Sequence, residues 1–175
     1  MGQKVNPLSY RLKTSSTSPE WMSSWYADKR KYKDLLLEDY KIRQALEKKL
    51  ASAGIVNIRI ERSAKKIKIT LVVSRPGLVI GRGGKELETT KNLVQKFLTK
   101  LNSKTNIDIQ VEEFKNTDLS AKLIAEKISY QLAKRMPYRR VVLGAMEKAM
   151  IAGVKGIKVQ LGGRINGAEI SRREK

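Results

Sequence analysis

The sequence predicts an α+β fold in two units that follow an irregular basic arm. Apolar residues recur every three or four positions in four segments, the spacing of one helix face. In four other segments they alternate with polar residues, the period of a half-buried strand. A polar hinge at 115–117 divides these segments into a first and a second unit along the chain. We therefore expect a basic N-terminal arm over 1–38, a first domain over 39–114 and a smaller C-terminal α/β domain over 115–175.

The first domain is predicted to open with a helix and continue with two strands. Asp39 suits the N-cap of the helix, and Gly54 suits its C-terminal stop. Both strands have apolar residues at every second position. The two apolar rows are Val56, Ile58 and Ile60, and then Ile67, Ile69, Leu71 and Val73.

A glycine-rich stretch, VIGRGG over 79–84, follows the second strand. Glycine has no Cβ, so its backbone can turn to positive φ and its N–H groups can approach phosphate oxygens closely. A helix that starts just after such a loop points its first amides and its positive dipole end at the same anion. The loop residues that we expect to bind RNA are Gly81, Arg82, Gly83, Gly84 and Lys85.

The order of the predicted elements makes this loop informative. A short apolar turn over 78–80 before the glycines, a helical stripe over 87–101 and an alternating strand over 107–111 complete the order α-β-β-α-α-β. That is the arrangement of a type II KH domain, which has a G-x-x-G loop between its two consecutive helices. The alternative is that the loop is kept for folding alone.

The C-terminal domain is predicted to be α-α-β. Asp118 can cap its first helix, and Pro137 prevents that helix from continuing. A second helix should run from Tyr138 to about 152. Apolar residues then alternate over 157–161 as a single strand, which needs partners that this chain does not obviously supply.

Composition favours a nucleic-acid partner and argues against catalysis. The chain of 175 residues has 37 Lys and Arg against 17 Asp and Glu, a formal charge of +20, which attracts polyanions. It has no His and no Cys, which excludes a Ser-His-Asp triad, a Cys-His pair and thiolate or His-rich metal sites. No apolar run reaches the ~18 residues of a membrane span. We expect no enzyme, catalytic residue, metal, cofactor, small-molecule substrate or membrane partner.

The N-terminal arm combines cations with aromatic residues. Such side chains can pair with phosphates and stack on bases, so we expect them to bind RNA. The alternative is that the two Trp side chains cover the edge of the following domain. The arm residues predicted to bind RNA are Lys4, Arg11, Lys13, Trp21 and Trp25.

Four ordered segments resemble the bacterial type of the small-subunit ribosomal protein S three family. They are MGQKVNPLSYRL at the start, Trp25-Tyr26-Ala27, RPGLVIGRGG over 75–84, and YRR through GAEISR over 138–172. Asn6 stands where the family usually has His. The resemblance implies a structural constituent of the cytoplasmic ribosome. It would bind small-subunit rRNA in the head and form the mRNA entry channel with neighbouring ribosomal proteins.

The resemblance also assigns individual residues of the C-terminal domain. Arg139 and Arg140 match the mRNA-facing pair of the family's entry helix, but the third basic position is Leu143 here. Lys134, Arg135 and Lys148 are the nearby cations that could contribute. Arg164 is expected to bind rRNA. The family continues beyond GAEISR, so this chain, ending at Lys175, looks shorter than the family norm.

Two other functions are consistent with parts of the sequence. A free-standing KH-domain RNA chaperone or regulator would share the same loop and the same charge. A nuclease or lyase could work through carboxylates or a lysine, although the Asp and Glu residues are scattered. The long signature over 138–172 argues against the first, and the composition argues against the second.

Overall fold

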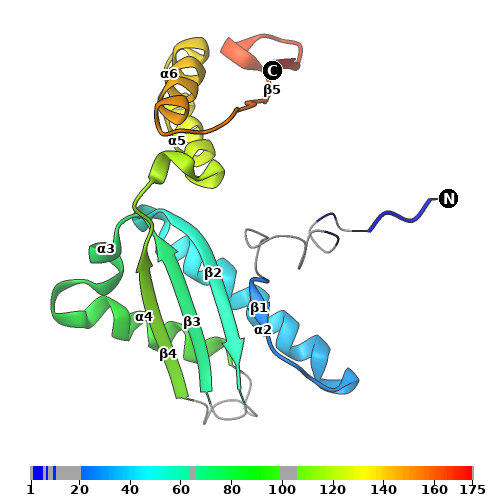
Figure 1. Ribbon diagram of the computed structural model, residues 1–175, viewed down its shortest axis with the longest axis vertical. Coiled ribbons are helices and arrows are strands. Elements are labelled where there is room, and N and C mark those ends of the chain that lie inside the picture. The colour runs from blue at the N-terminus through cyan, green and yellow to red at the C-terminus, as the bar shows by residue number, and fades with distance from the viewer. Residues whose placement is uncertain are drawn as a thin grey trace.

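A computed structural model describes residues 2–5, 7, 10, 21–63, 66–98 and 106–174. Figure 1 shows a sheet with helices on one face and a pair of helices beyond one end of the sheet. Of the helices described, none is long and apolar enough to cross a bilayer. The helices are α2 (Lys29–Lys49), α3 (Pro76–Ile80), α4 (Lys85–Phe97), α5 (Ala121–Ala133) and α6 (Tyr138–Ile151).

The strands of the first domain are β1 (Ser23–Ser24), β2 (Ile55–Arg62), β3 (Lys66–Val73) and β4 (Asn106–Glu113). The domain has the predicted α-β-β-α-α-β order, formed by α2, β2, β3, α3, α4 and β4. The sheet order is β1-β2-β3-β4, with β2 antiparallel to β3 and β4 parallel to it. Helices α2 and α4 lie together behind the sheet (Figure 1).

The core lies between the sheet and these helices. Ile60, Ile69 and Ile109 lie opposite one another across three strands, and Ile60 and Ile69 are fully buried. The alternation predicted for β3 is confirmed. In β2 the buried row begins at Ile55 rather than Val56, because the register shifts by one residue there. Such a bulge turns the next side chain to the other face.

Two predictions about the arm and the first helix were wrong. Residues 1–38 are not irregular throughout, since β1 pairs in parallel with β2 and α2 begins at Lys29. Asp39 is not an N-cap but lies in the middle of α2, with only 2% of its surface exposed. Its carboxylate instead accepts hydrogen bonds from Arg62, Ser23 and Trp25, as described in the Discussion.

The C-terminal domain contains the two predicted helices in an antiparallel pair. Ile124 and Ile128 of α5 pack against Val141 and Ala149 of α6. Helix α6 begins at Tyr138, as predicted. The N-cap of α5 is Ser120, not Asp118, because Asp118 lies in a 3₁₀ turn (Thr117–Leu119) before the helix.

The last strand also differs from the prediction. Hydrogen-bonded pairing begins only at Leu161, in β5 (Leu161–Gly163), whose antiparallel partner is β6 (Arg172–Glu174). Ile157, Val159 and Leu161 still alternate in burial and pack on α5 and α6. Among the residues described, 157–160 have no partner strand, and alternation of side chains alone does not make a strand.

Candidate nucleic-acid interface

The glycine loop forms an open turn between α3 and α4. Gly81, Gly83 and Gly84 have φ values of 69°, 63° and 79°, which side chains with a Cβ rarely adopt. A Cβ added to Gly83 or Gly84 would meet no atom within 4 Å, so the space above the loop is free for a ligand. An added Cβ at Gly81 would meet the side chain of Glu86 at 2.7 Å. The positive φ values, rather than a lack of space for a side chain, therefore explain why glycine occupies positions 83 and 84.

Helix α4 begins directly after this loop at Lys85. The N–H of Lys85 donates to Arg82 O, and no side chain caps the helix, so the amides of its first turn after Lys85 are available to an anion. Arg82 and Lys85 are both exposed beside the opening. Glu86 in the first turn opposes an anion, but Lys49 lies 3.8 Å from its carboxylate and offsets part of that charge. The loop thus combines free amides, open space and two mobile cations.

The arm contributes less free aromatic surface than predicted. Trp25 is half-buried, donates its indole N–H to Asp39 over 2.8 Å and contacts the Tyr32 ring, with centroids 5.2 Å apart. Trp25 therefore covers the domain edge, the alternative considered above. Trp21 is 58% exposed and Lys4 is also exposed, so both are open to a partner. Arg11 and Lys13 lie outside the described residues.

A second basic surface lies at the junction of α5 and α6. Arg139 and Arg140 are exposed in the first turn of α6, where no side chain caps the helix. Arg139 Nε donates to the Tyr138 hydroxyl over 3.1 Å, and the Tyr138 hydroxyl lies 2.9 Å from Glu174. The hydrogen bond to Tyr138 raises the pKa of the Arg139 guanidinium above its ordinary value. Because a helix dipole disfavours cations at its N-terminus, this placement does not serve helix stability.

The structure brings some of the predicted entry-helix cations together and separates one. Lys134 and Arg135 follow α5 directly, and Lys134 Nζ lies 4.4 Å from the centroid of the Tyr130 ring. Lys148 lies near the other end of α6. Leu143, at the usually basic position, is 58% exposed and interrupts the basic surface.

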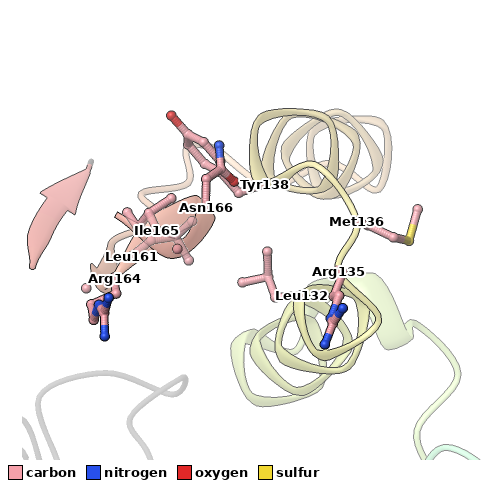
Figure 2. Close-up of a pocket in the computed structure, with 11 residues that line it drawn as sticks. Leu132, Arg135, Met136, Tyr138, Leu161, Arg164, Ile165 and Asn166 are labelled. Atoms are coloured by element: carbon pink, nitrogen blue, oxygen red, sulfur yellow. The ribbon is translucent and has the colours of Figure 1, made fainter. Parts of the chain in front are cut away.

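Arg164 lies across a pocket from this junction. The pocket, of about 660 Å³, opens between the end of α5, the start of α6 and residues 161–167 (Figure 2). Arg135 and Arg164, predicted for different RNA contacts, both line it. Asn166 lines it too and was missed, although Asn-Gly at this position is a turn signal in the sequence.

No group of three or more His, Cys, Asp or Glu that could hold a metal ion occurs in the described ranges. The fold, the open glycine loop and the charge of +20 together define a KH-domain protein that binds RNA. Family models agree with this class. The model described as "KH domain" matches residues 41–119, and that described as "Ribosomal protein S3, C-terminal domain" matches 128–175.

Curated relatives extend the match to nearly the whole chain. Small ribosomal subunit protein uS3 of Persephonella marina is 44% identical over 174 residues, covering 99% of this chain and 74% of the relative. The proteins of the same name from Crocosphaera subtropica and Protochlamydia amoebophila are 48% and 47% identical over 174 residues, or 70% and 78% of their lengths. The chain belongs to the uS3 family of ribosomal proteins. That family is not enzymatic, in agreement with the prediction.

Proposed function

We propose that the chain is a structural constituent of the small ribosomal subunit in the cytoplasm, bound to rRNA in the subunit head and forming part of the mRNA entry channel with neighbouring ribosomal proteins. The observation that carries this proposal is the match to uS3 proteins over 174 residues. Three parts are proposed to contribute: the arm (1–38, which includes the start of α2), the KH domain (39–114) and the C-terminal domain (115–175).

The geometry supports rRNA binding by the KH loop. Its free amides and exposed cations suit the sugar-phosphate backbone and carry no sequence preference of their own. The alternative, a free-standing RNA chaperone, would use the same loop without joining a ribosome.

Sedimentation separates these two functions. A tagged copy of the full chain, expressed in a bacterium, should sediment with small subunits at moderate salt, and a reconstruction should place it in the head. A chain that stays at the top of the gradient while binding RNA would indicate the free-standing chaperone.

The α5–α6 junction supports contact with mRNA. Arg139 and Arg140 extend into solvent at a helix end whose dipole disfavours them, which points to an anionic partner outside the chain. Arg139→Ala with Arg140→Ala should slow translation through stable hairpins more than on unstructured messages. The matched control, Lys155→Ala with Lys158→Ala, removes the same charge from exposed positions of the same domain. Equal slowing on both kinds of message would count against the channel role.

A further inference from the structure

The pocket between α5, α6 and residues 161–167 has the lining of a nucleotide site. Its volume of about 660 Å³ lies in the usual range for small-molecule sites and far exceeds the needs of one phosphate. Figure 2 shows the guanidinium groups of Arg135 and Arg164 pointing toward the same side, with Leu132 between them. Tyr138 and Asn166 lie together on the other side of the pocket. One side is thus cationic, and the other offers an aromatic ring and a carboxamide.

Arg135 stands where the backbone prefers glycine. Its φ is 59°, its N–H donates to Leu132 O over 2.9 Å, and the N–H of Met136 donates to Gln131 O over 3.3 Å. This pair of bonds is the Schellman motif that ends many helices, with Arg135 at the left-handed position that Gly usually occupies. An L side chain there strains the backbone. Glycine would end α5 in the same way without this cost, so the motif itself does not explain why an arginine stands here.

Asn166 is a second left-handed residue, with a φ of 54°. Among the residues described, Arg135 and Asn166 are the only ones other than glycine with positive φ, and both line this one pocket. Asn tolerates the left-handed region, and Asn166 begins an Asn-Gly turn, so Arg135 is the unusual residue of the two. Residues other than glycine and Asn that are held in this region cluster at binding sites.

The neighbouring polar groups are already held in place. Arg164 Nε donates to Ala168 O over 2.8 Å, and the Tyr138 hydroxyl bonds to Glu174. Within the described part of the chain, the terminal guanidinium nitrogens of Arg164 form no further hydrogen bond or ion pair. Groups that are fixed before binding lose less entropy when the ligand arrives.

We propose that this pocket holds one unpaired nucleotide of an RNA strand, with its phosphate at Arg135 and Arg164 and its base against Tyr138 and Asn166. The proposal rests on the proposed function and adds a preference for an extruded nucleotide to it. An aromatic ring can stack on any base, and an amide can bond to a base edge. Arginine binds phosphate with two parallel hydrogen bonds.

The test uses the full chain and RNA hairpins that differ by one nucleotide. One hairpin is fully paired, and four others each carry one of the four bases as a single bulge. Fluorescence anisotropy at fixed salt should show tighter binding, on the order of tenfold, to at least one bulged hairpin. Equal binding of all five hairpins by the wild-type chain would overturn the proposal.

Glycine substitutions separate binding from folding. Arg135→Gly and Asn166→Gly each relieve a left-handed residue, so the thermal midpoint should stay the same or rise, by about 2 °C for Arg135→Gly. Both should reduce the preference for the bulge to less than about twofold. Stable variants that keep the full preference for the bulged hairpin would refute the proposal. The charge control is Lys155→Ala, and loss of the preference in this variant would reduce the effect to net charge and equally refute the pocket.

Two further results are informative. One distinguishes RNA from a free nucleotide as the ligand, and the other distinguishes the pocket proposal from the proposed ribosomal function. Displacement of the bulged hairpin by micromolar AMP or GMP would assign the pocket to a free nucleotide and overturn the RNA assignment. A chain that prefers the bulge but fails to sediment with small subunits would refute the proposed function alone. A chain that sediments with them and shows no preference would refute the pocket alone.

Discussion

Asp39 is expected to be among the most sensitive positions of the KH domain. Its carboxylate accepts hydrogen bonds from Arg62 Nε at 2.9 Å, from Arg62 Nη2 at 2.5 Å, from the Trp25 indole at 2.8 Å and from the Ser23 hydroxyl at 3.1 Å. These contacts join β1, β2 and α2 in one buried cluster. Arg62 has a second partner, Glu38, at 2.8 Å, and its side chain is only 7% exposed.

The substitution Asp39→Ala removes one acceptor from a buried charge cluster. Breaking such a pair destabilises by roughly 3 to 5 kcal/mol, because the remaining charge stays buried. The indole and hydroxyl donors also lose their acceptor, at about 1 kcal/mol or more each, but the terms overlap. Glu38 still offsets part of the Arg62 charge. We therefore expect a loss of about 4 kcal/mol, a large part of the ~5 to 15 kcal/mol of a typical domain.

Urea unfolding followed by tryptophan fluorescence measures this loss, since Trp25 lies in the cluster. The control is Asp34→Ala, an exposed position of the same helix, which should change stability by no more than ~0.5 kcal/mol. Alanine has a higher helix propensity than Asp at both positions. This gain in stability is common to the two variants, so it cancels when their free energies of unfolding are subtracted. A difference below about 1 kcal/mol would refute the view that this cluster anchors the arm.

Two other predictions concern the loop and a tight turn. Arg82→Asp with Lys85→Asp should weaken binding of the full chain to single-stranded RNA. The slope of log K against log salt should fall in magnitude by roughly 0.7 for each lost phosphate contact. An unchanged slope would show that the loop makes no phosphate contact. Gly54→Ala, at a φ of 67° and with a Cβ that would collide with a neighbouring hydroxyl, should destabilise by about 1 to 3 kcal/mol in urea. Gly156→Ala, in open space, should do so by less than ~0.5 kcal/mol, and equal losses would refute the steric argument.

Periodicity predicted most of the fold because the buried faces follow it closely. The row Ile67, Ile69, Leu71 and Val73 is buried as expected, and the start of α6 follows from the proline before it. The KH loop was predictable because glycine pattern and element order agree. In each case a local rule and the tertiary environment require the same residue type.

The wrong predictions concern positions where tertiary contacts, rather than local sequence preferences, determine the structure. Asp39 has the residue type of an N-cap, yet partners from three elements hold it inside a helix. Residues 29–38 contain few buried apolar side chains, so no stripe indicated that α2 begins ten residues earlier. The pocket beside Tyr138 could not be predicted, because it depends on a positive φ at Arg135, a residue type that usually avoids it, and on how residues 161–167 pack against α5 and α6.

Strand β4 ends the sheet on the side away from β1, and no further strand covers it in the part of the chain that the structure describes. An open edge invites pairing with another chain during synthesis, before any RNA has bound. Exposed Glu112 and Glu113 stand at its end, in a chain whose net charge is +20. Two copies approaching edge to edge would each carry the net charge of +20, and a parallel alignment would also bring their carboxylates together. The net charge therefore opposes self-association through this edge, and the two carboxylates also repel phosphate from it.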